Sequence, residues 1–410
     1  MDKKGALNLY LGLRFFSALF FGTIVTVNLV YQAVVVGLNP LQLVLVGTLL
    51  ESVCFFFEVP TGIVADLYSR KISVVIGFFL TGIGFIFEGT FPTFEGVLIA
   101  QVIWGIGATF VSGAREAWIA DEVGDAAAGK AFMRGQKLNQ VGMFLGIILS
   151  MLLANIDIRL PIVLGGIFYA LQSVYLLIFM PEDNFKPVPP KKRETFAAMK
   201  RTFLNGFYNV KKDKKLLSIV TIVMIFGMFS EGLDRLWTPF LISDFSFPEI
   251  GGLQPVVWFG IISLMATLMA AFMIKIIGRK IDVDDQNSIT RTLYMVNLSL
   301  ALTVFIFGVS FGFISAAAAY CFVFMLKESF GPLTEILINK GVKKDVRATI
   351  FSFSSQMNSL GQVTIGPILG LIASLISIKI GIIAAGAILL LSLPLYSYLF
   401  KAYRIKRINI

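Results

Sequence analysis

Ionisable side chains occur inside several long apolar stretches of this 410-residue sequence. Carrying a charge into the hydrocarbon of a membrane costs about 2.5–3.5 kcal/mol on insertion scales, so such groups are candidates for function. A buried carboxylate can take up and release a proton, and it can also attract a cationic solute. Because the sequence contains no histidine, the side chains that carry protons are expected to be carboxylates.

Two of these carboxylates, Glu51 and Glu58, are seven residues apart and lie on nearly the same face of one apolar helix. Glu51 is the deeper of the two, and no basic residue lies within one turn of it. Since desolvation favours the protonated form of a carboxyl group, Glu51 is the first choice for a proton carrier. For Glu58, a structural role in the loop that follows and a role in proton coupling are equally open.

Further charges occur near the middle of two later apolar stretches. Glu231 and Arg235 are four residues apart and can pair on one helix face, so a structural ion pair is the alternative to a role in transport. Asp234 points about 100° away from Arg235, which favours a partner on another helix and makes Asp234 a second candidate for proton coupling. The adjacent Lys327 and Glu328 also point apart from each other.

The elements that must position these residues are membrane spans. The chain is 57% hydrophobic and only 15% charged, with a mean hydropathy of +0.83, whereas soluble domains are about 45–50% apolar. A solvent-exposed fold is therefore excluded. Twelve segments are of the right length and composition to span a bilayer: 9–36, 41–65, 72–90, 94–119, 131–154, 160–180, 216–243, 253–277, 289–309, 313–338, 349–375 and 378–400.

The net charge of +10 is concentrated in alternate loops, as the positive-inside rule describes, and not in a nucleic-acid-binding patch. This distribution predicts a multi-pass protein of the cell membrane with both termini in the cytoplasm. The two cysteines, Cys54 and Cys321, lie in separate spans and imply neither a disulfide framework nor a metal site.

One charged segment between the second and third spans has a recognisable pattern. Gly62 is followed by Asp66 and then by the pair Arg70 and Lys71. A glycine here is expected to let a neighbouring helix come close, and Asp66 is expected to accept hydrogen bonds from the start of another helix. The spacing resembles the signature loop of the major facilitator superfamily, although Leu67 stands where that family usually has a basic residue and Ser69 where it usually has glycine.

The resemblance implies an all-α membrane protein with twelve transmembrane helices in two six-helix pseudo-repeated bundles, which transports a solute by alternating access. It further implies a cytoplasmic gate, for which surface charge at the headgroups is the alternative, made of Gly62, Asp66, Arg70, Lys71, Arg115 and Glu116. In the family, the first, fourth, seventh and tenth helices line a central cavity. The substrate-cavity candidates on these helices are Asn28, Tyr31, Gln32, Trp104, Glu231, Asp234, Arg235, Trp237, Lys327 and Glu328.

Two observations divide the chain into halves. A shift of 219 residues places Glu116 on Glu335, Phe132 on Phe351, Asn139 on Asn358 and Gly142 on Gly361, which indicates a repeat. Between the halves is a basic segment in which Phe196, Met199, Phe203, Phe207 and Val210 recur at helical spacing. We expect an N-terminal bundle over 1–180, a cytoplasmic linker with an amphipathic helix over 181–215, and a C-terminal bundle over 216–410; a plain solvated linker is the alternative.

Other motifs of the family are reduced. Gln101 replaces the arginine that begins the family's motif in the fourth helix and that is associated with proton coupling, so coupling by that route is in doubt. The antiporter motif of the fifth helix keeps Gly142 and Gly146 without its Gly-Pro pair. The run from Ser112 to Ala117 is most similar to bacterial drug-efflux members of the family.

These features predict a secondary active transporter that exports amphipathic or cationic small molecules in exchange for protons. No cofactor, metal or nucleic acid is implied, a monomer is expected, and membrane lipids are natural partners. A lipid or glycolipid flippase, with Arg14 and Lys327 on an anionic headgroup, and a nutrient importer remain alternatives. An enzyme is poorly supported because the sequence offers no nucleophile–base pair, metal-ligand cluster or phosphate-binding glycine loop.

Overall fold

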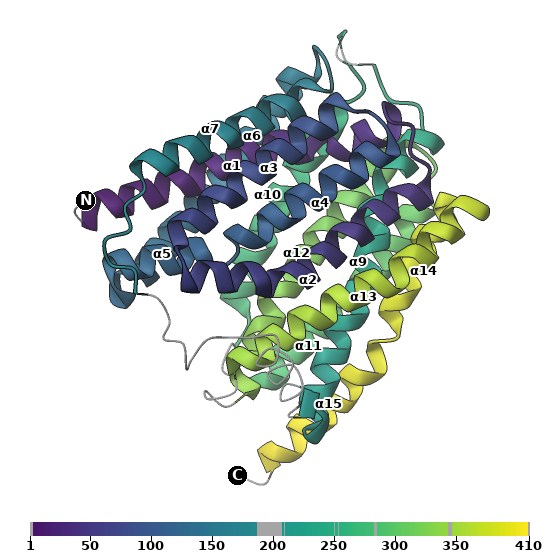
Figure 1. Cartoon of the computed structure of the whole chain (residues 1–410). Helices are drawn as coiled ribbons and strands as arrows, with labels where there is room; N and C mark the ends of the chain where they lie inside the picture. The colour runs from purple at the N-terminus through teal and green to yellow at the C-terminus, as the bar shows by residue number, and fades with distance from the viewer. Residues whose placement is uncertain are drawn as a thin grey trace. The chain divides into compact units, whose positions relative to one another are not determined.

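The computed structural model describes residues 3–186, 207–208, 210–249, 251–252, 254–282, 285–342 and 347–408. Within these ranges every regular element is a helix (Figure 1), and twelve helical segments are long and apolar enough to cross a membrane. The predicted fold class and the twelve predicted spans are confirmed. Most of the amphipathic helix expected from Phe196 to Val210 lies outside the described residues.

By the density of internal contacts the chain forms two compact units, and α2 (Pro40–Leu67) contributes to both. The first unit contains residue 49 onward of α2 and six further helices. These are α1 (Lys3–Val34), α3 (Arg70–Thr90), α4 (Phe94–Val111), α5 (Ala114–Val123), α6 (Asp125–Ala154) and α7 (Leu160–Phe179). Its core is built around Trp118, whose indole N–H donates to the carbonyl oxygen of Pro181 at 2.6 Å.

The second unit contains residues 39–48, which include the first turns of α2, and most of the C-terminal half of the chain. Within it, the amide of Asn297 donates to the hydroxyl of the fully buried Tyr396 at 2.8 Å. Its helices are α9 (Lys214–Asp244), α10 (Val257–Lys280, from residue 261), α11 (Gln286–Gly308), α12 (Phe313–Gly341), α13 (Arg347–Leu375), α14 (Ile378–Leu390) and α15 (Leu393–Ile408).

Short polar side chains begin several of the helices. The side chains of Ser69, Thr93, Asp213 and Ser377 accept hydrogen bonds from free backbone N–H groups in the first turns of α3, α4, α9 and α14. The predicted fourth span is interrupted at Gly113, whose φ of 71° is open mainly to glycine. Because the positive φ at Gly113 breaks the helix, α5 forms a separate helix at the end of that span.

Each unit contains a pair of closely packed helices, and the two pairs correspond to each other. In the first unit α6 lies along α1, and in the second α13 lies along α9 (Figure 1). A Cβ atom at Gly142 of α6 would overlap the carbonyl oxygen of Phe15, and one at Gly361 of α13 would overlap that of Met224. Glycine at these positions therefore lets the two backbones touch. The pair Gly142 and Gly361 matches the shift of 219 residues found in the sequence.

We predict that Gly142→Ala destabilises the protein, because its methyl group would overlap the backbone of α1. Overpacking of this kind costs roughly 1–3 kcal/mol. The measurement is the midpoint of thermal unfolding of the detergent-purified chain. Gly129→Ala is the control, since Gly129 lies on the same helix with nothing near a Cβ, and alanine there is expected to keep or raise the midpoint. Equal midpoints for the two variants would contradict the close packing of α6 on α1.

Candidate functional site

A buried ion pair lies on α9 in the second unit. The Nε of Arg235 is 3.2 Å from Oε1 of Glu231, and the side chain of Glu231 is only 4% exposed. Two glycines make room for this pair. A Cβ at Gly47 would overlap the Glu231 carboxylate and the Arg235 guanidinium, and one at Gly366 would press on the Glu231 side chain. The pairing expected for Glu231 and Arg235 is present, and neighbouring backbones enclose it.

Asp234 finds its partner on another helix, as its direction on α9 suggests. The ammonium of Lys327 on α12 lies 2.5 and 2.6 Å from the two carboxylate oxygens of Asp234. The Lys327 side chain is 15% exposed, whereas that of Asp234 is 41% exposed. Asp234 is therefore a carboxylate that is both neutralised by a lysine and open to a solute.

Aromatic rings accompany this pair. Trp237, one turn after Asp234 on α9, stacks on Tyr320 of α12 with ring centroids 4.0 Å apart and an interplanar angle of 12°. Glu328 follows Lys327 on α12 and acts electrostatically on both Lys327 and Tyr320. The predicted cavity residues of α9 and α12 thus gather in the second unit as charges beside stacked rings.

The signature segment forms a charge cluster in the first unit. The guanidinium of Arg70 donates to Asp66 at 2.8 Å and to Asp121 of α5 at 2.7 Å, and it lies 5.9 Å from the centre of the Phe185 ring. Two carboxylates on one arginine make charge-assisted hydrogen bonds that tie α2, α3 and α5 together. Asp66 and Arg70, both predicted for the gate, are in direct contact.

Two details of the predicted gate are corrected. Gly62 lies inside α2, which continues to Leu67, and a Cβ there would meet no atom of the described residues within 4 Å, so the close helix approach expected at Gly62 is not found among them. The carboxylate at the start of α3 is Glu182 and not Asp66. Glu182 accepts from the Ser69 hydroxyl at 2.5 Å and from the backbone N–H of Lys71 at 3.0 Å.

The other two gate candidates form a second cluster, with a residue of α1. Nη2 of Arg115 lies 2.7 Å from Oε1 of Glu116. The same oxygen is 3.6 Å from Arg14, whose other nitrogen donates to Gln136 of α6 at 2.7 Å. The predicted gate residues are therefore divided between an Arg70 cluster and a Glu116 cluster.

Four of the predicted cavity residues surround Glu88, a carboxylate on α3 that sequence reasoning missed. Both Asn28 and Gln32 of α1 donate amide hydrogens to its Oε1, at 2.8 and 2.7 Å. The Tyr31 hydroxyl donates to its backbone oxygen at 2.7 Å, and the Trp104 indole donates to Gln101, which in turn donates to Glu88 Oε2 at 3.3 Å. Because Glu88, Tyr31 and Gln32 are each 0% exposed, Tyr31 and Gln32 belong to a packed network here and do not line an open cavity.

Its place in the sequence explains why Glu88 was missed. It is two residues from the end of the predicted span 72–90, where a carboxylate ordinarily meets headgroups and water. The signal that could have found it is the spacing of amides on α1: Asn28 and Gln32 are one turn apart on one face of an apolar helix, and such a pair needs a polar partner.

The two carboxylates of α2 differ in exposure. Glu51 is half-buried, whereas Glu58 is exposed and accepts a hydrogen bond from Ser112 at 3.3 Å. The bond to Ser112 connects Glu58 to the interruption between α4 and α5. The roles of Glu51 and Glu58 in proton coupling stay predictions.

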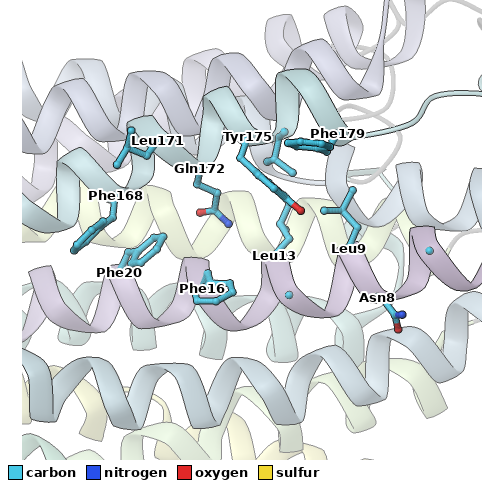
Figure 2. Close-up of a pocket in the computed structure, with 13 residues that line it drawn as sticks. Asn8, Leu9, Leu13, Phe16, Phe20, Phe168, Leu171, Gln172, Tyr175 and Phe179 are labelled. Atoms are coloured by element: carbon cyan, nitrogen blue, oxygen red, sulfur yellow. The ribbon is translucent and has the colours of Figure 1, made fainter. Parts of the chain in front are cut away.

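A separate apolar groove of about 590 Å³ runs between α1 and α7 (Figure 2). Phe20 of α1 stacks on Phe168 of α7 with centroids 5.2 Å apart, and Tyr175 and Phe179 extend the lining. Both Tyr175 and Phe179 are more than half exposed. The groove suits an acyl chain or another slender apolar molecule, and it includes none of the predicted cavity residues.

Comparisons with known proteins identify the family of the chain. Residues 11–363 match the family model described as Major Facilitator Superfamily. The chain is 24% identical over 375 residues to a Bacillus subtilis (strain 168) protein named "Uncharacterized MFS-type transporter YxaM", with 88% of each chain covered. It is also 23% identical over 182 residues to Multidrug resistance protein 1 of the same organism, with 44% of each chain covered.

A solved structure has the same fold. The inward-facing, unoccupied structure of a bacterial homologue of the human lysosomal transporter Spinster superposes with a TM-score of 0.76 at 12% identity. The match covers 98% of this chain and 97% of the other.

We predict that Asp234 and Lys327 are energetically coupled. Asp234→Asn or Lys327→Met alone leaves a charge without its partner and lowers the midpoint of thermal unfolding, whereas the double variant loses less than the sum of the two. The coupling is expected between about 0.5 and 3 kcal/mol, toward the low end because Asp234 is partly exposed. Asp244→Asn, at an exposed site near the end of α9, is the control. Strict additivity would contradict the pairing.

Proposed function

The chain belongs to the major facilitator superfamily and is a secondary transporter, and from this premise we propose that it exports amphipathic or cationic small molecules in exchange for protons. The family and fold are those of transporters and not of enzymes. The observation that carries the proposal is Asp234, a partly exposed carboxylate that a lysine neutralises beside a stacked tryptophan and tyrosine.

This arrangement suits a cationic cargo. A solute cation approaching Asp234 can take the place of the Lys327 ammonium, while its apolar part lies against Trp237 and Tyr320. Attraction of a cation to an aromatic face contributes about 0.5–2 kcal/mol, depending on how well water is excluded. A proton arriving at Asp234 removes the negative charge that holds the cargo. Cargo and proton therefore compete for one carboxylate, which is the requirement for exchange.

Glu51 supplies the second carboxylate of the proposal. It is half-buried and lies on α2 about two helical turns before Glu58. Proton uptake by Glu51 and Glu58 would change the charge of α2, the helix whose last turn carries Asp66 of the Arg70 cluster. Coupling then consists of a charge change on α2 that accompanies opening or closing of the cytoplasmic gate.

The subtype and the membrane arrangement are part of the proposal. Similarity to Multidrug resistance protein 1 over 182 residues supports a drug-efflux type of cargo. We further propose that the protein is a monomer. We place it in the cell membrane with both termini in the cytoplasm, because basic residues are concentrated in alternate loops. The proposed division is a bundle over 1–180, a linker over 181–215 and a bundle over 216–410.

The first test measures accumulation of a fluorescent lipophilic cation in inside-out vesicles with an imposed pH gradient. One proton per monovalent cation at a gradient of one pH unit sustains about tenfold accumulation, and nigericin should abolish it by collapsing the gradient. We predict that Glu51→Gln loses the accumulation driven by the pH gradient, because glutamine cannot take up a proton.

Glu95→Gln, at an exposed site in the first turn of α4, is the matched control and should transport as the wild type does. A Glu51→Gln variant with wild-type pH dependence would remove Glu51 from the coupling mechanism. Wild-type vesicles that accumulate nothing, although the protein is folded, would contradict export of cations by proton exchange.

We predict separately that Asp66→Asn slows transport without changing its dependence on the pH gradient. The substitution removes one of the two carboxylates on Arg70, so the cluster that joins α2, α3 and α5 is weakened. Initial rates of uptake at saturating substrate measure the effect. Rates equal to those of the wild type would argue against a role of the Arg70 cluster in gating.

A further inference from the structure

The side-chain hydrogen bonds of Glu88 named above all come from neutral groups. Asn28, Gln32 and Gln101 each present an amide N–H to the carboxylate, within 2.7 to 3.3 Å. Hydrogen bonds from amides stabilise the ionised carboxylate, while complete burial disfavours it. These two effects act in opposite directions on the protonation of Glu88, as they must at a site that exchanges protons.

The residue at position 101 matters for this balance. The resemblance to the family places an arginine there, and this chain has Gln101, which donates to Oε2 of Glu88. An arginine within hydrogen-bond distance would hold the carboxylate ionised. A neutral amide leaves it able to accept a proton.

Gln32 can serve either state of Glu88. Its Nε2 donates both to Glu88 and to Asn28 Oδ1, whereas its Oε1 is buried and receives no hydrogen bond from the described residues. Turning the Gln32 amide over would present this oxygen to Glu88, at the expense of the hydrogen bond from Nε2 to Asn28 Oδ1. The oxygen would then accept from a protonated carboxyl group, just as the N–H now donates to an ionised one.

We propose that Glu88, Asn28, Gln32 and Gln101 form a proton-binding site in the first unit, in which one proton binds a carboxylate oxygen of Glu88 and the Gln32 amide rotates to accept the new O–H. The role of this proton in transport rests on the proposed function: it adds a fourth coupling carboxylate to Glu51, Glu58 and Asp234. The binding of the proton itself is independent of any cargo.

The titratable groups near this site include Tyr31 and Arg159. From α1 the titratable group is Tyr31, which is hydrogen-bonded to the backbone oxygen of Glu88. From the segment before α7 it is Arg159, whose charge acts on Tyr31.

The test is infrared difference spectroscopy of the purified full chain as the pH is lowered. The wild type should gain a carbonyl stretching band of a buried protonated carboxyl group, and the band should shift in D₂O. Glu88→Gln should lose this band, while Glu95→Gln should keep it. Gln101→Arg, which supplies the cation that the family pattern expects, should suppress the band or move its appearance to lower pH.

A Glu88→Gln spectrum that keeps the buried-carboxyl band would overturn the proposal. So would a wild-type spectrum that responds to Na⁺ at constant pH and not to acid, because the site would then bind a metal cation. Size-exclusion profiles show whether each variant is folded. Because glutamine has nearly the same shape as glutamate, the Glu88→Gln variant can be compared directly with the wild type.

Transport measurements separate this inference from the proposed function. If the wild type accumulates cations, Glu88→Gln should lose most of the accumulation driven by the pH gradient while retaining exchange of labelled for unlabelled substrate, which needs no gradient. If the wild type accumulates none, the proposed function fails, and the infrared result still decides whether Glu88 binds a proton.

Discussion

Hydrocarbon offers a polar side chain no hydrogen bonds, so each charge that this chain carries into a span needs a partner from the chain itself. The structure meets this requirement in three ways. Arg235 and Lys327 pair with carboxylates on α9. Amides of α1 and α4 surround Glu88. Carboxylates from two helices converge on Arg70. In each arrangement, a proton or a solute that neutralises one group would release the group paired with it.

The spans and the family could be predicted from the sequence because both depend on local properties. A run of apolar residues long enough to cross a bilayer is helical wherever it lies, since only its own backbone can satisfy its hydrogen bonds. The signature segment is also local, with Asp66 and Arg70 one turn apart and in contact. The partner of Arg235 could be found in the same way, because Glu231 lies on the same helix.

The rest depends on which helix faces meet, and spacing along one helix does not contain that information. Lys327 is 93 residues from Asp234, and its ammonium could equally have faced Glu328 or a cavity. Glu182, which accepts hydrogen bonds at the start of α3, comes from the segment after α7. That Gln32 and Gln101 both donate to Glu88 could be seen only in the structure. We predicted Asn28, Tyr31 and Gln32 as cavity residues, whereas the structure buries Tyr31 and Gln32 completely.

In the proposed mechanism, proton movement and cargo movement are strictly coupled. Proteoliposomes with a trapped pH-sensitive dye test it directly, because a gradient of a lipophilic cation can be imposed with no pH gradient present. The account predicts that the cation gradient alone drives protons in the opposite direction, and that an uncoupler dissipates the resulting pH difference. Cation movement without any change of lumenal pH, measured on folded and reconstituted protein, would contradict it.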